Sequence, residues 1–105
     1  MISRIWHGYT TKSNADIYEN LLRNEIFIGI RERNIRGYEG IQLFRRELPN
    51  ETEFITIMWL DSLDSVKDFA GIDYEKAVVP DTARKVLSRF DQTSQHYSVI
   101  ADNYK

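Results

Sequence analysis

Two histidines, His7 and His96, are the residues of this sequence best suited to proton transfer. Histidine changes charge near neutral pH, so a pocket that takes a proton from a phenol would use it as the base. His7 is our first candidate for a catalytic residue and His96 the second. The alternative is that both are core or interface residues bonded to the backbone, and the residues alone leave that alternative open.

Aromatic side chains accompany the two histidines and are candidates for the walls of a ligand pocket. An aromatic ring on a strand with two apolar faces more often packs in a core or an interface than binds a ligand. For Trp59 we therefore favour packing over a role as a stacking platform. The full set of pocket candidates is Trp6, Tyr9, Trp59, Phe69 and Tyr97.

Several other chemistries find no support in the residue spacing. Neither HxH nor HExxH occurs, and no carboxylate stands at ligand spacing from a histidine, so we expect no metal. Cysteine is absent, which excludes thiolate ligands and cysteine nucleophiles. The sequence has no GxSxG elbow, no GxGxxG fingerprint and no phosphate-binding loop, so we expect no nucleotide cofactor.

Length and composition predict one domain spanning residues 1–105. The chain is 42% hydrophobic and 29% charged, which is typical of a globular protein. Its net charge of −2 is spread over interspersed residues, so neither nucleic acid nor a membrane is an expected partner. No apolar leader begins the sequence, and with the absence of cysteine this makes the cytoplasm the expected compartment.

The stretch Phe54–Leu60 predicts the strand around which the other elements are organised. Successive side chains of a strand point to opposite faces, and here both faces are apolar, so both must be covered. Phe54, Met58 and Leu60 share one face, and Ile55, Ile57 and Trp59 share the other. Local helices can cover one face of the sheet. We expect a second copy of the chain to cover the other, in a homodimer.

The remaining patterns predict the order β-α-β-β-α-β, an α+β fold of the ferredoxin-like class with an antiparallel sheet. Strands are expected over residues 2–10, 41–48, 54–60 and 96–101. A helix is expected from Ala15 to about Arg33, capped by Ser13 and ended by Asn34. Gly29 inside it predicts a bend or a close approach.

Two shorter helices are expected in the second half of the chain. Asp61-Ser62 caps the first of these, and Gly71 ends it. Pro80 opens the second, in which apolar residues recur at helical spacing. The residues of that apolar stripe are Ala83, Val86, Leu87 and Phe90.

The run Phe54–Gly71, FITIMWLDSLDSVKDFAG, resembles the antibiotic biosynthesis monooxygenase domain family. The features that carry the resemblance are Asp61-Ser62 after the central strand, Phe69-Ala70-Gly71, Pro80, and the closing His96-Tyr97-x-Val99. The resemblance covers nearly the whole chain and implies a dimeric α/β barrel. It also implies an activity: in cofactor-free oxygenases of this family, a deprotonated polycyclic phenol itself donates an electron to dioxygen.

Haem-degrading members of the same family carry an Asn on the first strand, a Trp on the short helix after the third strand and a His soon after it. Here the first strand has no Asn, Phe69 takes the place of the Trp, and the expected His region reads Ala77 to Asp81. We therefore do not expect haem degradation. The expected function is a cofactor-independent monooxygenase or a small-molecule-binding protein that acts on an aromatic or quinone-like metabolite. The alternative is a non-catalytic dimer that binds or senses a ligand.

Overall fold

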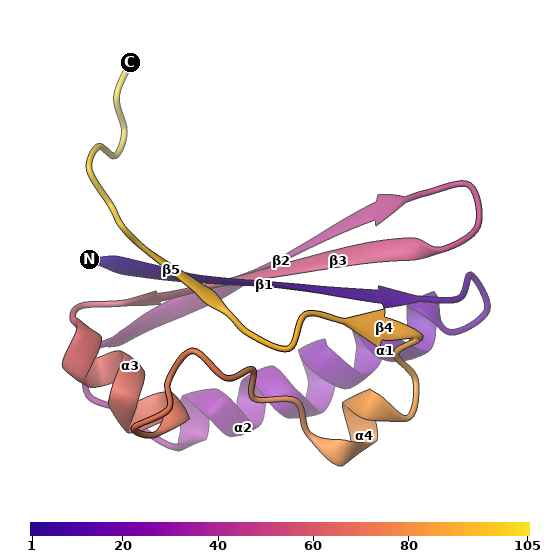
Figure 1. Ribbon diagram of the computed structural model, residues 1–105, viewed down its shortest axis with the longest axis horizontal. Helices are drawn as coiled ribbons and strands as arrows, with labels where there is room; N and C mark the ends of the chain where they lie inside the picture. Colours follow the sequence, from indigo (N-terminus) through magenta and orange to yellow (C-terminus); the bar gives the residue numbers. More distant parts are fainter.

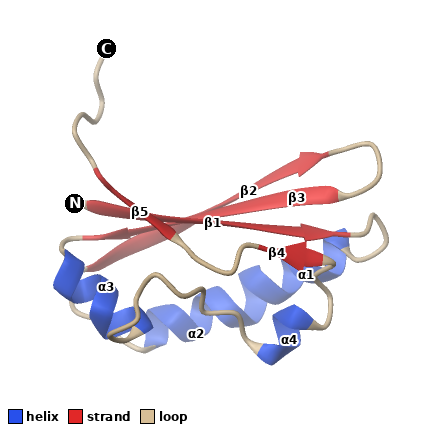
Figure 2. Cartoon of the chain, viewed as in Figure 1, coloured by secondary structure: helices blue, strands red, loops and turns tan.

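The computed structural model describes all 105 residues, in two layers with every helix on one side of a single sheet (Figures 1 and 2). The C-terminal residues extend away from both layers (Figure 1). No helix has the length and apolar character needed to cross a membrane. In chain order the elements are β1 (Ile2–Thr10), α1 (Ala15–Leu21), the π-helical turn η1 (Leu22–Ile26), α2 (Phe27–Glu32), β2 (Tyr38–Glu47), β3 (Thr52–Leu60), α3 (Leu63–Ala70), α4 (Asp81–Arg84), β4 (Arg89–Phe90) and β5 (Gln95–Ser98).

The sheet is antiparallel, and β1 and β3 are its central strands. Its order is β2-β3-β1, and β4 and β5 pair with successive parts of the outer edge of β1. The register places His7 opposite Ile55 and Arg4 opposite His96. This arrangement confirms the predicted α+β, ferredoxin-like class.

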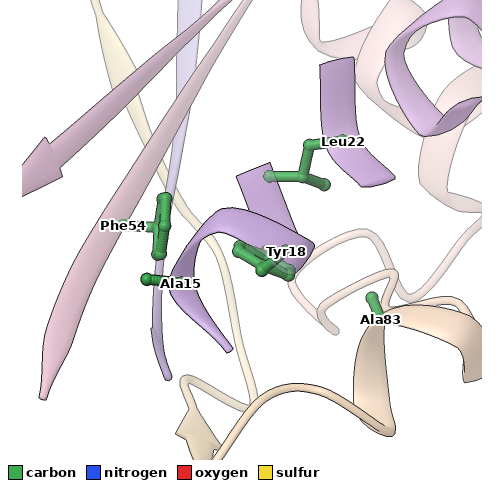
Figure 3. Close-up of a cluster of buried hydrophobic side chains, with 5 residues drawn as sticks. All are labelled: Ala15, Tyr18, Leu22, Phe54 and Ala83. Atoms are coloured by element: carbon green, nitrogen blue, oxygen red, sulfur yellow. The ribbon is translucent and has the colours of Figure 1, made fainter. Parts of the chain in front are cut away.

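Alternation along β1 and β3 separates the two faces of the sheet as predicted. Phe54 and Leu60 are fully buried under the helices. The ring of Tyr18 from α1 meets that of Phe54 edge-on, with centroids 4.9 Å apart. Figure 3 shows this cluster, with Ala15 and Leu22 on the same helical segment and Ala83 approaching from α4. By strand alternation and pairing, Ile5, His7, Ile55, Ile57 and Trp59 lie on the opposite face, which we call the open face. No helix covers this face (Figure 1).

The first helical region spans the predicted residues but differs in detail. Its middle turn, η1, is π-helical, and the cap is Asn14 without a side-chain hydrogen bond, so the prediction of Ser13 as the cap was wrong. Asn34 ends the region with a positive φ of 52°, as predicted. A Cβ on Gly29 would have no heavy atom within 4 Å, so this glycine marks no close approach.

The C-terminal third contains the main corrections. The predicted helical stripe through Phe90 ends early, because α4 closes at Arg84 and Ser88 then donates a backbone hydrogen bond to Tyr9. That bond brings Arg89–Phe90 alongside β1 as β4. The last strand covers Gln95–Ser98 instead of residues 96–101, and beyond it Ile100 is 90% exposed.

The short helix α3 matches its prediction. The side chain of Ser62 accepts a hydrogen bond from the backbone N–H of Ser65 at 3.2 Å, and Gly71 follows the last turn with φ of 91°. Between Gly71 and α4 the chain forms no helix or strand. We call residues 72–80 the strap, because they cross the helix side of the sheet between α3 and α4 (Figure 1).

Candidate functional site

A cavity of about 70 Å³ lies between the sheet and the elements that cover it. Trp6 and Met58 line it from the strands, Leu22 from the first helical region, and Val79 from the strap. Of its 16 lining residues 12 are hydrophobic, so the cavity is suited to an apolar ligand.

Arg4 is the one charged residue in the cavity wall. Strand alternation directs it to the helix side, and its side chain is 5% exposed. Its Nη1 donates to the carbonyl of Tyr74 at 2.6 Å, and its Nη2 donates to the carbonyl of Lys76 at 3.2 Å. Both carbonyls belong to the strap, so Arg4 fastens the strap to β1.

The charge of Arg4 has no acidic partner within ion-pair distance. The ring of Phe69 lies 5.4 Å from the guanidinium carbon and offers a cation–π contact. Burial lowers the pKa of Arg4 to about 10, which still leaves the guanidinium protonated at neutral pH. The cavity therefore has an unpaired cation in a mostly apolar wall.

His96 lies beside Arg4 and does not line the cavity. Its Nε2 is 2.9 Å from Nη1 of Arg4, and because arginine can only donate, Nε2 must be an unprotonated acceptor. The Tyr74 ring packs edge-on against the imidazole, with centroids 5.2 Å apart. Burial, followed by the charge of Arg4, lowers the pKa of His96, and Glu75 opposes the shift.

His7 is on the open face, away from the cavity. Its Nδ1 is 3.2 Å from Oδ2 of Asp91, and both side chains are partly exposed. The backbone N–H of Asp91 also donates to the carbonyl of His7 at 3.0 Å, which fixes the two residues relative to each other. A carboxylate on Nδ1 leaves Nε2 as the nitrogen able to accept a proton. This pair has the geometry of a base and the residue that orients it.

The five aromatic candidates divide between the two faces. Trp6 and Phe69 line the cavity. Tyr9 is on the open face with His7. Trp59 and Tyr97 are on that face too, because both are paired with Ser3, which shares the face of His7. The sequence-predicted set is therefore split: two of its five aromatic residues line the cavity, together with Tyr18 and Phe27, and neither histidine does.

The sequence interpretation missed Arg4 and Asp91. Arg4 could have been found from the sequence, because strand alternation places it on the same apolar face of the first strand as Trp6 and Gly8. An arginine on such a face is either paired or functional. Asp91 gave no local signal, since it contacts His7 only through the pairing of β1 with β4. No group of three His, Cys, Asp or Glu side chains is placed to hold a metal ion.

Neither a family model nor a curated protein sequence matches this chain. Among solved structures, it is similar to a proposed antibiotic biosynthesis monooxygenase from Bacillus cereus, with a TM-score of 0.69. The two are 11% identical, and the similarity covers 99% of this chain and 97% of the other. The chain therefore has the α+β fold of the antibiotic biosynthesis monooxygenase domains, as the sequence resemblance implied. At this identity the similarity defines the fold and leaves activity and substrate open.

Proposed function

We propose that this protein binds a small aromatic or quinone-like metabolite in the cavity between its helices and its sheet. The observation that carries the proposal is an apolar cavity with Trp6 and Phe69 in its wall and a single cation beside them. Pockets for small molecules are lined mainly by apolar and aromatic side chains, and a few polar groups fix the orientation of the ligand. The proposal requires no cofactor.

The size of the cavity limits the ligand. An engineered apolar cavity that holds benzene has a volume of roughly 150 Å³. That volume is about twice that of the cavity in this protein. A ring therefore requires an outward movement of the wall. The strap is the element suited to move, because it is irregular and includes Val78 and Val79 of the cavity lining.

The experiment is a calorimetric titration with phenol and then with 1-naphthol, which adds a second ring. We expect phenol to bind the wild-type protein more tightly, because the larger ring must displace more of the strap. Ala83→Leu places extra carbon atoms where a 2% exposed residue lines the cavity, and it should abolish binding. Ala101→Leu, the same change at an exposed position, should leave binding unchanged. Equal binding by all three proteins would contradict a cavity site.

A second candidate function is a cofactor-independent monooxygenase, and two observations favour it. The similar Bacillus cereus structure is a proposed antibiotic biosynthesis monooxygenase. In addition, His7 shares the open face with Tyr9 and is oriented by Asp91. In this candidate function His7 would take the phenolic proton of a substrate on the open face, so a dimer formed through that face would have to leave His7 uncovered. Oxygen consumption with anthrone-type phenols separates this function from binding alone.

We further propose that the open face is the interface of a homodimer. Ile55, Ile57 and Trp59 contribute apolar surface there, and Phe44 in the neighbouring strand is 45% exposed. A contiguous apolar face of this kind is characteristic of an interaction surface. In a two-fold dimer both subunits use the same surface, so the open face of a second copy would provide the matching apolar surface.

A further inference from the structure

We infer that the ligand of the cavity is an acid, and that Arg4 binds its carboxylate. This inference rests on the proposed function, since it assumes that the cavity is where the ligand binds. It adds the chemical class of the ligand and a recognition residue. Three features of Arg4 support it: its unused donors, its unpaired charge and its position at the junction of cavity and strap.

The donors of Arg4 are only partly used. Nη1 donates to Tyr74 and to His96, and Nη2 donates to Lys76. A guanidinium has two hydrogens on each terminal nitrogen and one on Nε. The hydrogen on Nε and the second hydrogen on Nη2 therefore have no protein acceptor. Nε and Nη2 belong to the same guanidinium fork, whose N–H groups can bind the two oxygens of a carboxylate.

The charge of Arg4 is equally unsatisfied. All three of its protein partners are neutral: two backbone carbonyls and the unprotonated Nε2 of His96. A buried charge without a counter-charge costs free energy, and buried arginines are normally paired. A ligand carboxylate would supply the missing counter-charge. The arginine that recognises the acid would then pay no new desolvation cost, because the fold has already buried it.

The surroundings of Arg4 define the rest of the ligand. Apolar side chains, Trp6 and Met58 among them, make up most of the remaining wall, so the part of the ligand beyond the carboxylate must be apolar. Arg4 also holds two carbonyls of the strap, whose movement admits a ring. The carboxylate would thus bind where the strap meets β1, and an aromatic monocarboxylate is the simplest ligand of this class.

Benzoate and benzamide test the inference, because they have the same shape and differ in charge. In calorimetric titrations of the wild-type protein we expect benzoate to bind at least about ten-fold more tightly, which is typical of a hydrogen bond to a charged group. Arg4→Gln should remove this preference, so that the variant binds benzoate and benzamide with equal affinity. Arg23→Gln alters an exposed arginine paired with Glu19 and should keep the preference.

The outcomes separate the inference from the function on which it rests. Equal affinities for the two ligands in the wild-type protein would overturn the role of Arg4, and that comparison requires no variant to fold. A benzoate preference that persists in Arg4→Gln would overturn it as well. If phenol binds and neither benzoate nor benzamide does, the proposed function stands and the acid inference is wrong. If no aromatic probe binds, both are wrong.

Discussion

Nε2 of His96 accepts a hydrogen bond from Nη1 of Arg4 over 2.9 Å, although both side chains are titratable bases. This relationship joins the last strand to the first and positions the guanidinium at the cavity. It holds only while the imidazole is neutral, since a protonated His96 would place two cations in contact.

The neutral state of His96 predicts a loss of stability in acid. Its pKa is lowered from 6.5 in the folded protein, mainly by burial and then by Arg4. Below 6.5 the unfolded chain takes up a proton that the folded chain resists, so stability falls as the pH drops from 6.5 toward the folded pKa. His96→Gln keeps an acceptor and should lose this dependence. Urea unfolding of both proteins between about pH 5 and pH 8 measures the difference. Parallel stability curves would contradict the prediction.

Two glycine substitutions should change stability in opposite directions. Gly37 has φ of 85°, and a Cβ there would collide with Asp61 and Ser65, so Gly37→Ala should lower the free energy of unfolding by about 1–3 kcal/mol. Gly29 is in α2 with free space around it, and Gly29→Ala should raise that free energy by about 0.5–1 kcal/mol. Chemical denaturation measures both. A destabilising Gly29→Ala would show that this glycine has a role in packing.

The open face should determine the oligomeric state. We expect the wild-type protein to sediment as a dimer at micromolar concentration and Ile57→Glu to sediment as a monomer, because the substitution buries an unpaired carboxylate in the interface. Ile17→Glu makes the same change at a residue of α1 that is 54% exposed, and this variant should remain dimeric. A monomeric wild-type protein in analytical ultracentrifugation would eliminate the proposed interface.

If the protein is an oxygenase, His7 and Asp91 should matter unequally. His7→Ala removes the base and should reduce oxygen consumption with an anthrone by about 10²-fold or more. Asp91→Asn leaves the imidazole in place but loses the charge that orients it, so its loss should be smaller. His96→Gln is the control on the other face. Equal rates in the wild-type protein and His7→Ala would exclude His7 as the base.

The architecture could be predicted from the sequence because strand alternation and helical spacing are local signals. The two-sided run Phe54–Leu60 identified the central strand and its faces. The apolar stripe from Ala83 to Phe90 wrongly predicted one continuous helix. Leu87 follows helical spacing, but the residues after it pair with β1. Strand pairing between distant segments has no local signature, so the formation of β4 could not be predicted.

The candidate site was less predictable because it depends on which face each strand presents. Histidines and aromatic rings were identified by type alone, and β1 then directs His7 to one face and Trp6 to the other. Arg4 shares the face of Trp6, and its hydrogen bonds run to residues some seventy positions away. Only the fold shows that this arginine has no acidic partner.

The two tryptophans provide the most direct test of ligand binding in the cavity. Trp6 lines the cavity, while Trp59 is on the open face with its indole N–H bonded to Gln42. Each gives one indole resonance in a ¹⁵N-correlated NMR spectrum, which can be followed during a titration with benzoate. We predict that the Trp6 resonance shifts and saturates while the Trp59 resonance stays in place. A saturable shift of Trp59 with no change at Trp6 would place the ligand on the open face and contradict the account.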